Sequence, residues 1–325
     1  MLNVKLKIKR VVVKKLIIFD GNHLAYRCHY VLPQLKNDEG RSVGCIYGVL
    51  NSLFSIRKQY PGYKIAFAWD ERPTKRKELF SKYKENRKEK PDWFEEFLWQ
   101  LEQVKEILSH HKVDQYSAIG YEADDIAAKL VEDYKKSINR HATNRDDWEC
   151  ILVTSDSDWK QLVDDDNKIR LKNPIKNTIV LDEDVNTEYN INSPCQLAMI
   201  KAIRGDKSDN VPGIKRFPSK IASILAKEYK DVESLYEWLS TVNLSKKTEL
   251  PKKWLKALMD NKNRILKNYK LVKLGYLIPE DIKIIKGFEN LEELKLHYRK
   301  NSFKTFLGDL IKLELIRKNK NGANK

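Results

Sequence analysis

The feature that most constrains the fold of this chain is a repeated pairing of a short apolar run with an acidic residue just after it. KLIIF is followed by Asp20, YKIAFAW by Asp70 and, after one serine, CILVT by Asp156. Runs of this composition, bounded by polar residues, are typical of buried strands. Open parallel sheets bind ligands at the carboxyl ends of their strands. The sequence therefore predicts carboxylates gathered at one edge of a sheet.

Apolar residues at helical spacing separate these runs. The predicted strands are Lys15–Phe19, Tyr63–Trp69, Val113–Ala118, Cys150–Thr154, Lys168–Lys172 and Asn177–Leu181. The predicted helices between them are Ser42–Gln59, Asp92–His110, Ala123–Ser137 and Asp158–Val163. Strands that alternate with helices predict an α/β fold, in which helices flank a mostly parallel sheet.

The second half of the chain has a different pattern, because the strand signal ends near Ser193. The predicted helices there are Pro194–Arg204, Pro218–Tyr229, Val232–Thr241, Pro251–Tyr269, Leu291–Tyr298 and Ser302–Leu315. We therefore expect four parts. They are a basic N-terminal arm at 1–14, a core at 15–192, a helical region at 193–275 and a C-terminal helical region at 276–325 with a frayed tail.

The charge of the chain indicates a polyanionic partner. The net charge is +16 and the isoelectric point is about 9.4, which favours nucleic acid over a small substrate. No apolar stretch approaches the roughly 20 residues of a membrane helix. The first residues also lack the unbroken apolar centre of a secretory signal. We therefore expect an intracellular protein with no membrane partner.

Further acidic residues follow the first three along the chain. They are Glu122, Asp124 and Asp125 in GYEADD, Asp158 in SDSDW, and Asp206 and Asp209 in RGDKSDN. Taken singly, each cluster has an ordinary explanation as a helix N-terminus, an N-cap or a polar turn. Gathered in one pocket, carboxylates about 4 Å apart would repel by roughly 4 kcal/mol per pair at an effective dielectric near 20. Such a pocket needs hard cations such as Mg²⁺.

A basic segment, ERPTKRKELFSKYKENRKEK at 71–90, follows Asp70 directly. A charge run of this kind is often only a solvated helix. Here Phe80 and Tyr83 lie among the basic residues, and that mixture suits single-stranded nucleic acid. We interpret the segment as a nucleic-acid contact.

The order of these motifs resembles that of the flap endonuclease / 5′ nuclease family. The resemblance covers about residues 15–275 and rests on six motifs: IIFDGNHLAYR, AFAWDERP, YKENR, GYEADDIAA, VTSDSDWKQL and IRGDKSDNVPGI. The compact length, and YKENR followed by DWFEEFLW, most resemble the bacteriophage 5′ nucleases, including phage ribonuclease H. The resemblance implies a PIN-like core with a basic helical arch at about 71–110 and a helix-hairpin-helix-like region at 193–275.

The resemblance also implies two Mg²⁺ ions, for which Mn²⁺ can substitute. The first would be held by Asp20, Asp70, Glu122, Asp124 and Asp156. The second would be held by Asp158, Asp206 and Asp209, with Asp125 nearby. Two ions about 3.5–4 Å apart can stabilise both the attacking and the leaving oxygens of a phosphodiester displacement. His23, three residues after Asp20, is assigned to packing or capping.

Basic and aromatic residues complete the implied site. Lys84 and Arg87 would act on the scissile phosphate, so they join Asp20 and Asp156 as the catalytic set. The implied nucleic-acid contacts are Arg72, Lys75, Arg76, Lys77, Tyr83, Lys84, Arg87, Lys215, Arg216 and Lys220. The sequence PGIKRFPSKIA lacks a glycine that the family has in its duplex-binding turn, which leaves the family's K⁺ site in doubt.

These observations predict a Mg²⁺-dependent, structure-specific 5′ nuclease that acts in replication or repair. The expected substrates are 5′-flap DNA and RNA–DNA primer duplexes, cut by a monomer in the cytoplasm of a bacterial or phage-infected host. Exonuclease or endonuclease preference, and a helper such as a single-strand-binding protein or sliding clamp, stay open. The alternatives are a PIN-type endoribonuclease, which would lack the arch and the helical region, and an inactive DNA-binding protein, which would lack some acidic residues. A haloacid-dehalogenase-like phosphatase would need DxD where Asp20-Gly21-Asn22 stands.

Overall fold

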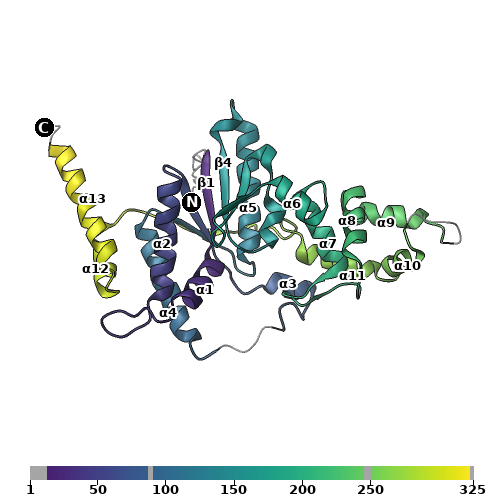
Figure 1. Cartoon of the computed structure of the whole chain (residues 1–325), viewed down its shortest axis with the longest axis horizontal. Helices are drawn as coiled ribbons and strands as arrows, with labels where there is room; N and C mark the ends of the chain where they lie inside the picture. The colour runs from purple at the N-terminus through teal and green to yellow at the C-terminus, as the bar shows by residue number, and fades with distance from the viewer. Residues whose placement is uncertain (1–12, 87–90, 245–249, 323–325) are drawn as a thin grey trace, which may run out of the picture.

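A computed structural model describes the backbone of residues 13–86, 91–244 and 250–322. Most of the predicted N-terminal arm, and Arg87, lie outside these residues. A seven-stranded sheet of order β6-β5-β4-β1-β2-β3-β9 forms the centre of the molecule (Figure 1). Its strands are β1 (Lys15–Asp20), β2 (Lys64–Ala68), β3 (Asp114–Ser117), β4 (Glu149–Val153), β5 (Ile169–Asn173), β6 (Thr178–Val180) and β9 (Lys283–Ile285). A small hairpin consists of β7 (Gly205–Asp206) and β8 (Val211–Pro212).

The described helices cover the sheet and build a second, helical part. They are α1 (Gly21–Val31), α2 (Gly44–Gln59), α3 (Thr74–Leu79), α4 (Phe94–His110), α5 (Ala123–His141), α6 (Asp182–Tyr189), α7 (Leu197–Arg204), α8 (Ser219–Glu228), α9 (Val232–Thr241), α10 (Lys252–Asp260), α11 (Lys262–Val272), α12 (Leu291–Lys300) and α13 (Lys304–Gly322). Short 3₁₀ turns lie at Arg145–Asp147, Asp158–Leu162, Asp165–Asn167 and Pro194–Gln196. Among the described residues, no helix has the length and apolar character needed to cross a membrane.

The pairing of the strands fixes where their ends lie. β1 pairs in parallel with β2 and β4, and the parallel pairs continue to β3 and β5. Only the edge strands β6 and β9 run antiparallel. The carboxyl ends of the five parallel strands therefore lie at one edge of the sheet, as the sequence predicts.

Successive side chains of β1 point to opposite faces of the sheet, and each face is covered by a layer of helices. Ile17 and Phe19 are fully buried in a core shared with α1, α2 and α4. Ile18 lies on the opposite face, in a core shared with α5. Because both faces of the strand are covered, nearly every residue of the run must be apolar.

A third core lies in the helical part, toward the right of Figure 1. Helices α7, α8, α9, α10 and α11 bury their apolar faces against one another there. Tyr83, from the basic segment, packs into the same core. The basic segment is thus attached to the helical part as well as to the sheet.

Several elements differ from the sequence prediction. Within the implied arch at 71–110, residues 94–110 form α4, which buries Phe97, Leu101 and Val104 in the core beside the sheet. The helix predicted at Pro251–Tyr269 is broken at Asn261, which leaves helical geometry. The predicted frayed tail is helical as far as Gly322.

The end of α7 provides a test of local packing. Gly205 has a φ of +82°, a conformation that favours glycine, and the backbone of Gly213 lies against it. A Cβ on Gly213 would lie 1.9 Å from the carbonyl carbon of Arg204, so Gly213→Ala must displace backbone. We expect Gly213→Ala to lower the free energy of unfolding by about 1–3 kcal/mol, measured by urea denaturation.

Gly308→Ala is the control for this measurement. A Cβ at Gly308 on α13 would meet no atom within 4 Å, and alanine favours a helix, so this variant should lose no stability. Equal urea midpoints for the two variants would contradict the packing argument.

Candidate active site

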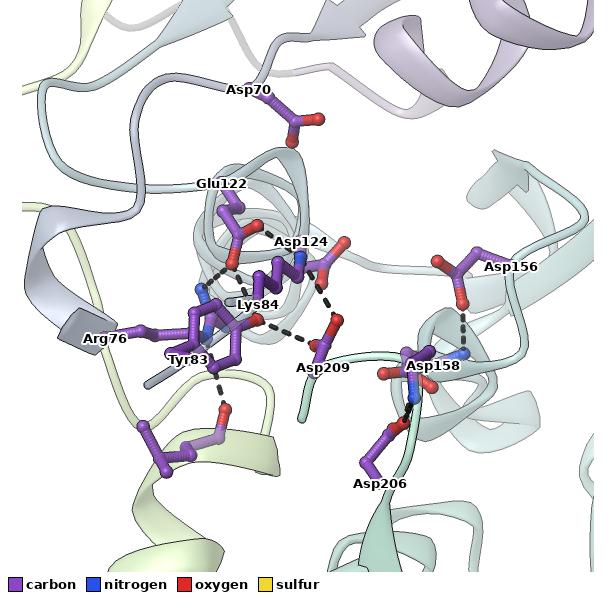
Figure 2. A network of polar contacts seen from close by, with 12 residues as sticks. Asp70, Arg76, Tyr83, Lys84, Glu122, Asp124, Asp156, Asp158, Asp206 and Asp209 are labelled. Carbon is purple, nitrogen blue, oxygen red and sulfur yellow. Dashed lines mark hydrogen bonds and ion pairs between the residues drawn. The ribbon is translucent and has the colours of Figure 1, made fainter. Parts of the chain in front are cut away.

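A cleft of about 880 Å³ opens at the carboxyl edge of the sheet, between the strand ends and the α7–β7 connection. Nine acidic residues line it: Glu188, and the eight motif residues Asp20, Asp70, Glu122, Asp124, Asp156, Asp158, Asp206 and Asp209. The eight motif residues come from five segments of the chain that are far apart in sequence. The expected gathering of carboxylates is therefore present in the structure, and Figure 2 shows all eight motif residues except Asp20.

Local structure positions the carboxylates of the first group, which consists of Asp20, Asp70, Asp124 and Asp156. Asp20 ends β1, caps α1 by accepting from the backbone N–H of His23 at 3.2 Å, and accepts from Thr154 Oγ1 at 3.0 Å. Asp70 accepts from the N–H of Ala123 at 2.8 Å. Asp124 accepts from Trp159 Nε1 at 2.9 Å. All four residues line the cleft.

The electrostatics of this group show mutual repulsion. Burial, and then the carboxylates of Asp70, Asp124 and Asp156, raise the pKa of Asp20 well above its ordinary value. Burial, and then Asp156 and Glu122, raise the pKa of Asp124 to about 7. A cation among these side chains would relieve that repulsion.

A lysine joins part of the second group, which consists of Asp158, Asp206 and Asp209. Lys201 on α7 donates to Asp206 Oδ2 at 2.8 Å and makes a close contact with Asp158 Oδ1. Burial raises the pKa of Asp206, but Lys201 and the hydroxyl and amide of Ser208 outweigh it, so the pKa lies below its ordinary value. The negative charge of this group is thus partly balanced within the chain.

Glu122 lies between the two groups and is held by the basic segment. Its pKa is lowered, because Lys84 and Arg76 together outweigh its burial. Lys84 contacts Glu122 Oε1 closely and lies 3.4 Å from Asp209 Oδ1 (Figure 2). The Tyr83 hydroxyl lies 2.8 Å from Glu122 and 2.7 Å from Asp209, so its one proton bridges the same pair.

Comparison with known proteins agrees with this geometry. Residues 15–190 match the family model of the 5′-3′ exonuclease N-terminal resolvase-like domain, and residues 192–293 match that of the 5′-3′ exonuclease C-terminal SAM fold. The chain is 31% identical to a 5′-3′ exonuclease of Buchnera aphidicola, over 89% of this chain and 95% of that protein. This chain belongs to the 5′-3′ exonuclease family.

Some relatives of this 5′-3′ exonuclease family member, the DNA polymerases I, are much longer. It is 34% identical to DNA polymerase I of Chloroflexus aurantiacus over 68% of its own length, but spans only 23% of that protein. Solved structures share the fold. The bacteriophage T5 D15 protein crystallised with metal ions has a TM-score of 0.63 at 19% identity, covering 92% of this chain and 98% of that one. Flap endonuclease-1 of Methanococcus jannaschii has a TM-score of 0.53 at 17% identity, covering 95% and 94%.

Two residues expected to contact nucleic acid lie inside the protein. Arg76 is only 3% exposed and pairs with Asp125 at 2.6 Å and with Glu122 at 3.1 Å. Tyr83 is 1% exposed. Neither side chain is at the surface, so the expected contacts of Arg76 and Tyr83 with nucleic acid are wrong for this structure. Both residues instead hold the acidic side chains in place.

Asp125 is also corrected as a metal-ligand candidate. Its carboxylate faces Arg76 with both oxygens and accepts from the N–H of Glu122 at 3.1 Å. It is 1% exposed and is not among the residues that line the cleft. The spacing Glu122-x-x-Asp125 forms a capping box at the start of α5, which explains why the two acids occur together.

The structure adds two residues that the sequence analysis did not place in the cleft. Lys201 lies outside the six motifs, and one of its two partners, Asp158, is 43 residues away. The side chain of His23, expected only to pack or cap, lines the cleft and bonds to Ser155, and ligating atoms of His23, Asp20 and Asp156 lie within 4.8 Å of one another. Its position three residues after Asp20, on the first turn of α1, could have indicated that His23 lies in the cleft.

The other basic candidates remain at the surface. Arg72, Lys77, Lys215, Arg216 and Lys220 are exposed, and Lys75 is half-buried beside Glu78. Of these, Lys220 lines the cleft. Their positions leave them accessible to a polyanion.

The buried Arg76 network gives a prediction that separates structure from substrate contact. Arg76→Met leaves the buried Asp125 and Glu122 without their guanidinium partner, so we expect a loss of about 3–5 kcal/mol in the free energy of unfolding. Lys77→Met changes an exposed neighbour on α3 and should stay within about 0.5 kcal/mol of the parent. Denaturant unfolding measures both. If Arg76→Met kept wild-type stability and only bound DNA more weakly, Arg76 would be a contact to nucleic acid, as the sequence predicted.

Proposed function

We propose that this chain is a Mg²⁺-dependent, structure-specific 5′ nuclease that hydrolyses phosphodiesters at 5′ ends or at the base of 5′ flaps. The observation that carries the proposal is that eight acidic side chains from the sequence motifs converge on one cleft at the carboxyl edge of the sheet. Oxygen-rich sites of this kind suit Mg²⁺ and, by the same ligand chemistry, Mn²⁺. Membership of the 5′-3′ exonuclease family supports the same reaction.

The carboxylates form two candidate metal positions. Asp20, Asp70, Asp124 and Asp156, with Glu122, would hold the first ion, and the raised pKa values of Asp20 and Asp124 fit a site built for a cation. Asp158, Asp206 and Asp209 would hold the second, which requires Lys201 to withdraw from Asp158 and Asp206. When bound, the ions would supply an activated water and stabilise charge on the attacking and leaving oxygens.

The chain's own cations would orient the substrate. Lys84 has a left-handed backbone (φ 55°), and its N–H donates to the carbonyl of Asp209 at 3.0 Å, which fixes its side chain beside Glu122. We assign Lys84 to neutralising charge that develops on the scissile phosphate. Arg87, in the same motif, is proposed to act with it.

The proposed substrates are 5′-flap DNA and RNA–DNA primer duplexes. Arg72, Lys75 and Lys77 on and beside α3 would meet the single strand, and Lys215, Arg216 and Lys220 would meet duplex phosphates. Contacts to phosphates position a nucleic acid without reading its sequence. Among the described residues no feature argues for a K⁺ site, and none is proposed.

The first test removes metal ligands. Asp20→Asn and Asp156→Asn should each lower the cleavage rate by on the order of 10²–10³, the equivalent of several kcal/mol of transition-state stabilisation, while DNA binding persists. The measurement is single-turnover digestion of a 5′-labelled flap beside an RNA-primed duplex, with product lengths read. The matched control is Asp166→Asn, an exposed residue in an acidic turn outside the cleft.

Wild-type cleavage rates in both Asp20→Asn and Asp156→Asn would show that this cleft does not carry out the reaction. Cleavage of single-stranded RNA in preference to either duplex substrate would favour the endoribonuclease alternative instead.

The second test addresses Lys84. Lys84→Met removes the ammonium group but keeps the length of the side chain, so we expect the single-turnover rate to fall on the order of 10²-fold with little change in affinity. Lys82→Met, an exposed change two residues earlier, should leave the rate unaltered. A loss confined to affinity would show that Lys84 binds DNA without acting on the phosphate.

The third test addresses duplex binding. Each phosphate contact contributes about 0.9 to the slope of log affinity against log salt. The double variant Lys215→Gln/Lys220→Gln should therefore flatten that slope by about 2, measured on flap DNA by fluorescence anisotropy. The control, Lys304→Gln/Lys312→Gln on α13, should keep the parent slope. Equal slopes in the two double variants would show that the duplex does not bind at Lys215 and Lys220.

A further inference from the structure

A second cluster of possible metal ligands lies far from the active site, where α12 packs on α4. Figure 1 shows these two helices beside each other at the left of the molecule. The cluster consists of Glu106 and His110 on α4 and His297 on α12, and their ligating atoms lie within 4.8 Å of one another. None of the three lines the cleft described above.

The backbone around the cluster is fixed by hydrogen bonds. The N–H of Phe288 donates to the carbonyl of Ser109 at 2.8 Å, and the N–H of Asn290 donates to that of His110 at 3.2 Å. The chain leading into α12 is therefore tied to the end of α4. The three side chains are held close by structure rather than by one another.

The two histidines lack ordinary partners. His297 is 7% exposed, and neither of its ring nitrogens has a hydrogen-bond partner among the described residues. The buried Nδ1 of His110 is also without one there. The next residue, His111, differs, because its Nε2 lies 2.5 Å from the Tyr298 hydroxyl and Arg57 lies near its Nδ1. Buried polar atoms are usually satisfied, so the orphaned nitrogens of His110 and His297 need an explanation.

An ion pair between Glu106 and a protonated His297 explains only part of this. The Nε2 of His297 lies 3.6 Å from Glu106 Oε1, which is beyond hydrogen-bonding distance. Such a pair would leave the Nδ1 atoms of both histidines unsatisfied. A ligand that engages both imidazoles and the carboxylate accounts for more of the cluster.

We propose that Glu106, His110 and His297 form a binding site for a zinc-class transition-metal ion. Two imidazoles and one carboxylate suit Zn²⁺ and not Mg²⁺, which prefers oxygen ligands. Ligands about 2.0–2.1 Å from a tetrahedral ion lie roughly 3.3 Å apart, so the 3.6 Å separation needs only a small adjustment. The half-exposed Glu106 leaves the fourth position open to water.

The site would join the C-terminal helices to the core. Because α4 is anchored beside the sheet and α12 comes from the far end of the chain, an ion at this junction crosslinks residues almost 200 positions apart. Its role is structural, and it is independent of the proposed nuclease reaction.

The test uses Zn²⁺ on the full chain in a large excess of Mg²⁺. Asp20, His23 and Asp156 in the active site could also hold zinc, so the background is Asp20→Asn/Asp156→Asn. We expect this background to keep one zinc per chain after dialysis, measured by elemental analysis. Its unfolding temperature should rise with added Zn²⁺.

Ligand removal then assigns the site. Glu106→Gln and His297→Gln in that background should weaken zinc binding by about 10–100-fold or more. Glu106→Gln changes a half-exposed side chain, so it tests the site even if His297→Gln fails to fold. The control is Glu102→Gln, an exposed residue one turn earlier on α4, which should retain the zinc.

Co²⁺ gives an independent readout, because a four-coordinate site with two histidines absorbs visible light far more strongly than a six-coordinate oxygen site. We expect the strong band in the background and its loss in Glu106→Gln. Absence of bound zinc in the background, or equal zinc binding in Glu106→Gln and Glu102→Gln, would overturn the proposal.

Discussion

Repulsion among carboxylates at the carboxyl edge of the sheet is the constraint on which the rest of the structure depends. Parallel strands deliver their ends to one place, and burial at that place makes each added negative charge costly. The compensating charges come from outside the sheet: Arg76 on α3, Lys84 in the basic segment and Lys201 on α7. Electrostatic balance therefore requires the basic segment and the helical part to stay attached to the core.

The negative charge of the carboxylates is balanced unevenly along the cleft. Glu122 and Asp206 keep lowered pKa values because lysine or arginine contacts them. Burial, and then the neighbouring carboxylates, raise the pKa values of Asp20 and Asp124. The same cleft thus has one end that demands an external cation and another that already contains an ammonium group. That single ammonium group balances only part of the charge of Asp158, Asp206 and Asp209.

Sequence patterns predicted the parts of the fold that depend on local chemistry. All six predicted strands are present. The central strands β1, β2 and β4 were recognisable because strands buried on both faces need nearly continuous apolar residues. β9 was not predicted, because it lies after Ser193, where the sequence pattern favoured helices. The eight acidic motif residues of the cleft were found from their order, although Asp125 was misassigned. The roles of Arg76 and Lys201 could not be predicted from the sequence. A basic residue has the same local sequence signal whether it faces solvent or a buried carboxylate.

The short strand β9 has a consequence for how this chain can be divided. It pairs antiparallel with β3 through residues 283–285 and thereby covers what would otherwise be an open sheet edge. The matched N-terminal family region ends at residue 190, long before that strand. A fragment cut at such a boundary would expose the backbone donors and acceptors of β3, a surface on which other chains can add strands. The two halves are therefore distinct in sequence, yet the first depends on the second for its own protection against self-association.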